Sequence, residues 1–281
     1  MNKELSADNK AVNGLWISPD GKPLSNLERL CIYSFCANGH DFHLWSYGDL
    51  PNIPADTAPG KVVLRDAAEI LPKNEIFFVA GSLAGFSDWF RWELMRQIGG
   101  WYVDMDVIAL RPFNFTADII FAEDEEDKFQ PETMKWPKGH WFADKMAGAV
   151  ERPKTLMPWD HRRYLWRKAK RMFFSRRKAR SSQGWGELAG PAGMSRALRH
   201  YKMTHFGINP YFFYGIPWCR SRQATLPDLH DMGILASLMN SAYSLNLNNS
   251  AICGHTLGKN GDFHPNSPFE ILKRRYLPEL Q

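Results

Sequence analysis

The stretch that decides the fold runs from Phe86 to Phe113 and reads FSDWFRWELMRQIGGWYVDMDVIALRPF. Apolar residues at helical spacing predict a helix over 83–98. Gly99 and Gly100 then end it, because glycine readily takes the left-handed conformation that a helix terminus requires. A short apolar strand follows at once over 101–106. A helix that is followed directly by a strand is typical of an α/β fold, in which helices cover the faces of a sheet.

Two aspartates, one residue apart, lie where this apolar strand ends. If the strand stays extended through them, Asp104 and Asp106 point to the same side, since side chains alternate along a strand. Open α/β sheets place their ligands at such strand ends. On the preceding helix, Asp88 and Arg91 are three residues apart and share a face. Carboxylate oxygens suit Mg²⁺ or Mn²⁺, so we expect a divalent cation and a phosphate-bearing ligand here.

The segments before this stretch predict parallel strands. An apolar run over 14–18 and an alternating run over 41–47 each read as a strand. Between them, Ser25 and Glu28 form a capping-box pattern that begins a helix. A strand, a helix and a second strand predict a βαβ unit. The chain has 281 residues, of which 44% are hydrophobic, enough for one large α/β domain over 1–281.

The later part of the chain is less regular. An apolar run over 119–122 reads as another strand. Gly190 and Pro191 break the chain before a short helix over 196–201. Further helices are expected over 229–243 and 269–276.

Positive charge is concentrated in one segment. The net charge is +5, yet the segment after His161 carries ten basic residues and no acid, which leaves −5 on the rest of the chain. Such a segment is either a solvated amphipathic helix or an interfacial helix for an anionic membrane or lipid-linked acceptor, and we favour the second interpretation. Charge alone would also suit nucleic acid, but no nucleic-acid fold signature accompanies it, so we expect none. The basic residues are Arg162, Arg163, Arg167, Lys168, Lys170, Arg171, Arg176, Arg177, Lys178 and Arg180.

Cysteine spacing and hydropathy indicate the compartment. Cys31, Cys36, Cys219 and Cys253 show no zinc-type spacing and are expected to be free thiols. The polar start of the chain has no signal-peptide core, and no apolar run reaches the roughly 18 residues of a membrane span. We expect a cytoplasmic protein. The basic segment extends this expectation to peripheral attachment at the inner face of the membrane.

The central motif resembles that of a known enzyme family. Ser87-Asp88-x-x-Arg91, followed by Gly99-Gly100-x-Tyr102-x-Asp104-x-Asp106, closely resembles the sugar-binding-region family of glycosyltransferases. That family includes yeast Golgi mannosyltransferases and bacterial capsular and lipopolysaccharide enzymes, and large glucosylating bacterial toxins share the spacing. Weaker resemblances extend to Leu15-Trp16-Ile17, which is similar to the family's first strand, to Gly190-Pro191 and to the late His255.

The resemblance implies a GT-A fold: a Rossmann-like mixed sheet flanked by helices, here with a basic helical insertion at 159–182. It implies a retaining, metal-dependent glycosyltransferase that uses a nucleotide sugar. A UDP-sugar is preferred and a GDP-sugar is the alternative. The acceptor would be a glycan, a lipid-linked molecule or a polysaccharide, as in capsule or lipopolysaccharide biosynthesis. Residues 1–125 would form the donor half and 126–281 the acceptor side.

The resemblance also implies roles at the donor site. Asp106 would bind Mn²⁺ or Mg²⁺ with His255 near the metal. Asp104 would contact ribose or donor sugar and reach the metal through water. Asp88 and Arg91 would hold donor-sugar hydroxyls, and the donor would also contact Trp16, stacked on the base, Ser87 and Tyr102.

Departures from the family pattern leave part of the site unassigned. Asp144-Lys145 stands where the family often has asparagine, and Thr256-Leu257-Gly258 follows the late histidine without the usual tryptophan. The acceptor side and the third metal ligand therefore stay open. Plainer interpretations also remain: Asp88–Arg91 as a surface pair, Trp16 as core and His255 as a structural histidine.

Two other functions compete with this one. The segment Val103–Val107 also resembles the haloacid-dehalogenase superfamily of phosphohydrolases, with Asp104 as nucleophile and Asp228 and Asp231 as the later acidic pair. That interpretation leaves Asp88 and Arg91 unexplained. A non-enzymatic protein that binds an anionic membrane through Arg162–Arg180 would explain only the basic segment.

Overall fold

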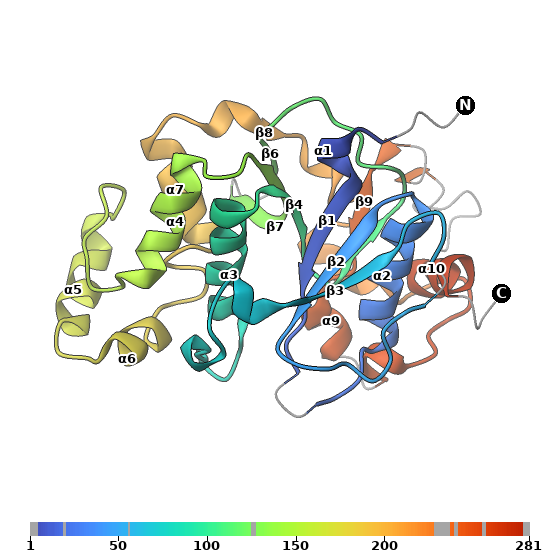
Figure 1. Cartoon of the computed structure of the whole chain (residues 1–281), viewed down its shortest axis with the longest axis horizontal. Helices are drawn as coiled ribbons and strands as arrows, with labels where there is room; N and C mark the ends of the chain where they lie inside the picture. The colour runs from blue at the N-terminus through green and yellow to red at the C-terminus, as the bar shows by residue number, and fades with distance from the viewer. Residues whose placement is uncertain are drawn as a thin grey trace. The chain divides into compact units, whose positions relative to one another are not determined.

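The computed structural model describes residues 5–18, 21–55, 57–124, 128–227, 237–238, 241–254 and 257–277 (Figure 1). Their α-helices are α1 (Ala7–Lys10), α2 (Asn26–Ala37), α3 (Ala84–Gln97), α4 (Trp141–Glu151), α5 (Arg162–Arg171), α6 (Arg176–Ser181), α7 (Pro191–His200), α9 (Asn249–Cys253) and α10 (Pro268–Tyr276). Their strands are β1 (Ala11–Leu15), β2 (Asp41–Ser46), β3 (Val62–Asp66), β4 (Gly100–Val103), β5 (Val107–Ala109), β6 (Ile120–Glu123), β7 (Phe129–Trp136), β8 (Gly207–Ile208) and β9 (Ser244–Asn246). Short 3₁₀ helices are η1 (Ala67–Glu69), η2 (Lys73–Glu75), η3 (Thr204–Phe206), η4 (Pro210–Phe212), η5 (Trp218–Ala224) and η6 (Gly258–Asn260).

The main sheet of the described residues is mixed and has seven strands in the order β3-β2-β1-β4-β7-β6-β8, while β5 and β9 pair separately. Strands β1 and β2 are parallel, as the βαβ pattern predicted, and β3 pairs parallel with β2. Strand β6 runs antiparallel to β7 and parallel to β8. The predicted α/β fold, with a mixed sheet flanked by helices, is confirmed.

The chain divides into two compact units. The first consists of Met1–Asp66, Val103–Thr116 and Asn209–Gln281, and the second of Ala67–Tyr102 and Ala117–Ile208. Each unit is built from segments that lie far apart in the sequence: three segments form the first unit and two form the second. The prediction of a single domain with donor and acceptor halves stays a prediction.

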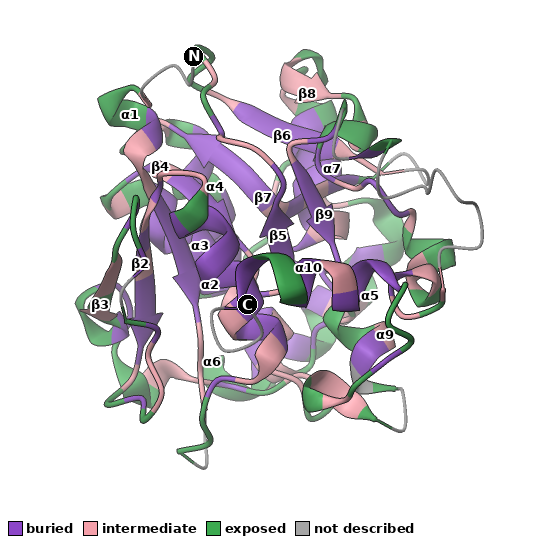
Figure 2. Cartoon of the chain, turned by 90° about the vertical axis from the view of Figure 1, so that its right-hand side faces the viewer, coloured by how far each residue is buried: buried purple, intermediate pink, exposed green. Residues whose placement is uncertain are grey.

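In the first unit, α2 packs against β2 and β5. Ser25 caps this helix as predicted, with its backbone N–H donating to the Glu28 carboxylate at 2.8 Å. The inner face of α2 buries Phe35, whose ring packs edge-on against Phe113. Figure 2 shows burial falling from β2 to β3, which is the edge strand of the sheet. One face of α2 is therefore buried against strands of the first unit, as is usual for a helix that covers a sheet.

A buried histidine joins three segments of the first unit. The Nδ1–H of His40 donates to the Asn9 carbonyl at 2.8 Å, while the Phe113 backbone N–H donates to His40 Nε2 at 2.9 Å. Because Nε2 must accept, the ring is neutral. Burial is the main cause that lowers the pKa of His40 to about 4.

In the second unit, α3 and α4 pack together over an aromatic core. The Trp136 ring stacks on Phe142 with centroids 5.0 Å apart and meets Trp92 edge-on at 5.6 Å. Offset and edge-on contacts are the arrangements that aromatic pairs prefer. Trp92 and Trp136 are therefore core residues. The eight-residue strand β7, which contributes Trp136, was not predicted.

Some predicted boundaries were wrong. The first strand begins at Ala11 and ends at Leu15, so Trp16 follows the strand. The helix expected over 196–201 already begins at Pro191, since proline is pre-organised for the first turn of a helix. The helix α3 (Ala84–Gln97) agrees with the predicted 83–98. The helix expected over 229–243 lies largely outside the described residues.

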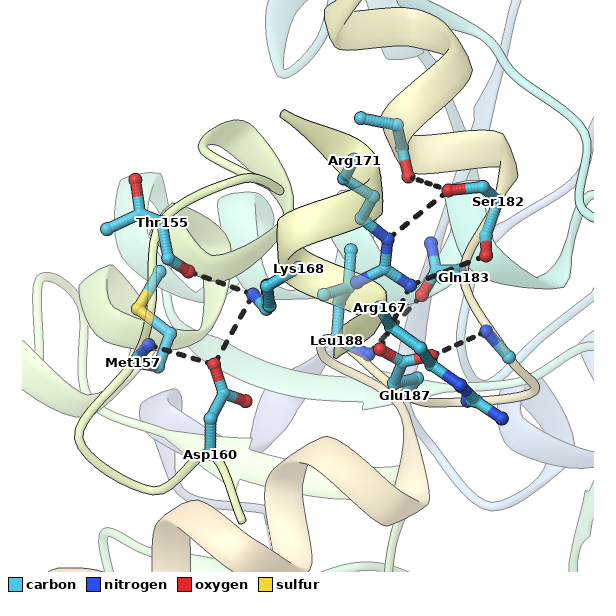
Figure 3. A network of polar contacts seen from close by, with 12 residues as sticks. Thr155, Met157, Asp160, Arg167, Lys168, Arg171, Ser182, Gln183, Glu187 and Leu188 are labelled. Atoms are coloured by element: carbon cyan, nitrogen blue, oxygen red, sulfur yellow. Dashed lines mark hydrogen bonds and ion pairs between the residues drawn. The ribbon is translucent and has the colours of Figure 1, made fainter. Parts of the chain in front are cut away.

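The basic segment forms two helices, α5 and α6, rather than one. Three of its ten cationic side chains, Lys168, Arg171 and Arg180, are buried in the second unit. They pair with carboxylates outside the segment (Figure 3): Lys168 Nζ lies 3.4 Å from Asp160 and Arg171 Nη2 lies 2.9 Å from Glu187. Helix α5 therefore packs one face on the second unit and exposes the other, as expected of an amphipathic helix on the body, and attachment to a membrane stays a prediction. No helix in the described part of the chain has both the length and the apolarity to cross a membrane.

Candidate functional site

Asp104 and Asp106 lie in a turn directly after β4. The Val107 backbone N–H donates to the Asp104 carbonyl at 3.1 Å, which closes the turn. The prediction of an extended strand through both aspartates was therefore wrong. The turn still keeps both side chains half-buried, and their charges interact.

The electrostatics of this turn suit a cation. Burial, followed by the neighbouring Asp104 carboxylate, raises the pKa of Asp106 to about 6. The Asn249 backbone N–H, which donates to Asp106 Oδ2 at 2.7 Å, and the nearby Lys259 ammonium act in the opposite direction. Two crowded carboxylates repel each other, and a divalent cation would relieve that repulsion with the oxygen ligands it prefers. The residues present therefore fit Mg²⁺ or Mn²⁺.

A remote segment completes the surroundings of Asp106. Strand β9 pairs antiparallel with β5, with Val107 opposite Asn246. Just beyond it, the Leu247 N–H donates to the Asp106 carbonyl at 2.9 Å. Asn248 then turns the chain with a φ of 54°, a conformation asparagine tolerates, and positions the Asn249 N–H at the carboxylate. The sequence patterns assigned no role to the asparagine-rich run at 246–249.

Trp16 lies in the first unit, half-buried, after β1. Lys259 Nζ lies 4.9 Å from the centroid of its ring and also forms an ion pair with the buried Glu28. The indole Nε1 of Trp16 is buried and has no hydrogen-bond partner among the described residues. Lys259 therefore links Trp16 to the surroundings of Asp106, and sequence analysis missed it because no pattern connects residue 259 with either.

The second unit holds the other predicted residues. Asp88 and Arg91 are both buried on α3, with Arg91 Nη2 3.7 Å from Asp88 Oδ1. Arg91 Nη2 also donates to Ser87 Oγ at 3.3 Å, and its guanidinium lies 5.1 Å from the centroid of the Tyr102 ring. The Tyr102 hydroxyl is 3.4 Å from Ser87 Oγ. The four residues therefore form one polar cluster, and the alternative of a surface pair at Asp88–Arg91 is wrong.

Gly190 allows Asp88 to occupy its position. A Cβ on Gly190 would lie only 2.3 Å from Asp88 Oδ2. Gly190 is the N-cap of α7, which begins at Pro191. The neighbouring Ala189 carbonyl accepts a 2.7 Å hydrogen bond from Trp92 Nε1, which fixes this loop to α3. The Gly-Pro pair noted in the sequence therefore adjoins the polar cluster.

The predicted residues thus fall into two groups. Trp16, Asp104 and Asp106 belong to the first unit, and Ser87, Asp88, Arg91 and Tyr102 to the second. Tyr102 and Asp104 are two residues apart along the chain. His255 and the acids Asp228 and Asp231 lie outside the described residues. Within the part of the chain that the structure describes, no three His, Cys, Asp or Glu side chains cluster as a metal site.

Comparisons with known proteins give structural similarities at low identity. No protein-family model and no curated protein matches the sequence. Among solved structures, the chain is similar to the PaToxG glycosyltransferase, with 14% identity over 70% of each chain and a TM-score of 0.45. It is also similar to an active-site mutant of LgtC, with 11% identity over 69% of this chain and 95% of that one and a TM-score of 0.35.

Proposed function

We propose that the protein is a retaining glycosyltransferase that transfers a sugar from a nucleotide sugar, with a UDP-sugar preferred and a GDP-sugar as the alternative. One observation carries the proposal. The buried cluster of Asp88, Arg91 and Tyr102 leads within two residues into the carboxylate turn at Asp104 and Asp106. A polar cluster that can hold hydroxyls and a carboxylate pair that can hold a cation are the two parts that a nucleotide-sugar site needs.

In this proposal Asp106 and Asp104 hold Mn²⁺ or Mg²⁺, with His255 as a further candidate ligand. When bound, the cation would supply Lewis-acid stabilisation of the departing diphosphate. Asp104 also contacts the ribose or the donor sugar. Lys259 adds a positive charge close to Asp106, so it is suited to the same diphosphate. Trp16 is proposed to stack on the nucleotide base, beside Lys259.

The second unit supplies the contacts to the donor sugar. Buried Asp88 is a hydrogen-bond acceptor and Arg91 a donor, and both are held by neighbours on α3 and β4. Fixed groups of this kind pay little ordering cost when a hydroxyl binds. The motif offers no separate nucleophile, so we propose that the acceptor attacks from the face that the leaving group vacates. Configuration at the sugar would then be retained.

The acceptor is proposed to be a glycan, a lipid-linked molecule or a polysaccharide, as in capsule or lipopolysaccharide biosynthesis. Attachment to an anionic membrane through the exposed cations of α5 and α6 would weaken with salt. No described contact favours the phosphohydrolase. A purely membrane-binding protein would leave the buried Asp88–Arg91 cluster unexplained.

The test measures the rate of metal-dependent nucleotide-sugar hydrolysis by the Asp106→Asn variant and by the unaltered protein. We expect the rate to fall about 100-fold or more, because loss of a few kcal/mol of transition-state stabilisation at about 1.4 kcal/mol per factor of ten has that effect. Asp118→Asn is a matched control, since this exposed acid has no role in the predicted site. Undiminished hydrolysis by a folded Asp106→Asn protein would rule the assignment out.

A further inference from the structure

The two basic helices enclose a preorganised cationic network in the second unit (Figure 3). Arg171 Nε donates to Ser182 Oγ at 3.2 Å, and its Nη2 lies 2.9 Å from Glu187. Glu187 also accepts from Arg167 Nη1 at 2.9 Å and from the Gly184 N–H at 2.8 Å. Burial alone would raise the pKa of Glu187, but these partners outweigh it and lower that pKa. The carboxylate is therefore ionised and holds both guanidinium groups in place.

A cavity of about 370 Å³ opens over this network. The described residues that line it include four cations, Arg167, Lys170, Arg171 and Lys178, and no acid. Glu187, which contacts two of them, balances one positive charge and leaves three. Such an excess of positive charge in a concave site attracts a multiply charged anion.

Two side chains in the lining of this cavity, Arg171 and Gln183, are only 1% and 5% exposed. Their Nη1 and Nε2 atoms are buried and have no hydrogen-bond partner among the described residues. The donors open to the cavity are therefore those of the exposed Lys170 and Lys178 and of the half-exposed Arg167. A phosphate offers several acceptor oxygens together with the negative charge that these cations favour.

Apolar side chains border the same cavity. The Trp166 ring is 62% exposed and lies under the Arg167 guanidinium, whose Cζ is 5.6 Å from the ring centroid. Lys178 Nζ lies 4.9 Å from the centroid of Phe174. Phe173, which follows the C-cap of α5 in sequence, is 91% exposed. Cations mixed with exposed aromatic rings are typical of surfaces that meet phosphate head groups next to apolar chains.

We propose that the cavity between α5 and α6 binds a phosphate group, as a phosphomonoester or a diphosphate. The phosphate would bind Arg167 and the two lysines. Its source is either the head group of an anionic lipid, with Phe173 and Trp166 facing the apolar region, or a free phosphorylated molecule. The site is independent of the proposed sugar transfer, because none of its residues belongs to the donor site.

The test titrates inorganic pyrophosphate into the full chain by calorimetry, with EDTA present to suppress binding at the aspartate turn. Lys170→Ala with Lys178→Ala should weaken binding about 100-fold, since each of the two charged contacts is worth on the order of 1.4 kcal/mol, a factor of ten. The control, Arg162→Ala with Arg163→Ala, removes the same charge from exposed residues outside the cavity lining. It should weaken binding less than about twofold, because neither arginine lines the cavity and salt screens their charge from a phosphate bound there. Asp106→Asn should bind as the unaltered protein does.

Vesicles of phosphatidylcholine with and without phosphatidate separate the two sources. Binding to phosphatidate vesicles that the cavity variant loses and the control keeps would assign the lipid head group. Pyrophosphate binding without vesicle binding would assign a free phosphorylated molecule. The proposal is overturned if pyrophosphate does not bind, if both variant pairs weaken binding equally, or if only Asp106→Asn weakens it.

Discussion

Replacing Gly190 by alanine tests whether the position of Asp88 determines activity. The added Cβ would lie 2.3 Å from Asp88 Oδ2, whereas ordinary contacts begin at 3.4 Å. The carboxylate must therefore move by about 1 Å, since the Gly186 backbone at 2.6 Å prevents Cβ from yielding in that direction. Misplacement of about 1 Å in a binding group can cost about 100-fold in rate. We expect kcat/KM for nucleotide-sugar hydrolysis to fall by about that factor.

Gly193→Ala is the matched control for this experiment. Its Cβ would also meet an atom at 2.3 Å, but that atom is the Leu188 carbonyl oxygen and not Asp88. Both glycines lie at the start of α7, so both changes should cost a similar stability of about 1–3 kcal/mol by overpacking.

The comparison is made at equal folded fraction, with melting temperature and kcat/KM measured for both variants. Gly193→Ala should retain most of its activity per folded molecule, because the Asp88 carboxylate is not displaced. If Gly190→Ala and Gly193→Ala have kcat/KM within about threefold of each other, the positioning of Asp88 does not matter and the reasoning is wrong.

Three further predictions concern other parts of the molecule. The pKa of His40 is about 4 in the folded protein, against 6.5 in the unfolded chain. Between pH 6.5 and pH 4, His40 therefore binds a proton in the unfolded chain but not in the folded protein. Stability should fall as pH drops from about 6.5 to 4, by about 3 kcal/mol in total, and urea unfolding of His40→Gln should lack this loss. Lys259→Met should raise the KM for the nucleotide sugar about tenfold by removing a charge near the diphosphate; an unchanged KM would exclude that contact. Glu187→Gln should lower the free energy of unfolding by about 3–5 kcal/mol, because Arg171 loses its buried counter-charge; a loss below about 1 kcal/mol in urea unfolding would contradict this.

Local sequence signals predicted much of the fold. The capping box at Ser25, the alternation over 41–47 and the glycine pair after α3 each correspond to an observed element. These signals depend on neighbours within a few residues, which is why a single sequence reveals them. The spacing of Asp88 and Arg91 likewise predicted that they share a face of α3, but it did not predict their burial.

The remaining features depend on contacts between distant segments. Nothing in the spacing of Asp104 and Asp106 indicated that a turn separates them, or that Asn249 would donate to the carboxylate from 143 positions away. The basic segment is a similar case. Its composition suggested solvent exposure, but Arg171 is buried because Glu187, outside the segment, compensates its charge.

The most direct measurement of the central claim is a thermal-shift panel of UDP- and GDP-sugars, each with and without Mn²⁺. A ligand present at about 100 times its Kd stabilises the folded chain by about 2.7 kcal/mol, which corresponds to a rise of several degrees. The account predicts that at least one nucleotide sugar raises the melting temperature of the unaltered protein only when Mn²⁺ is present. Asp106→Asn should lose that rise. No rise with any nucleotide sugar, or an equal rise in Asp106→Asn, would contradict the account.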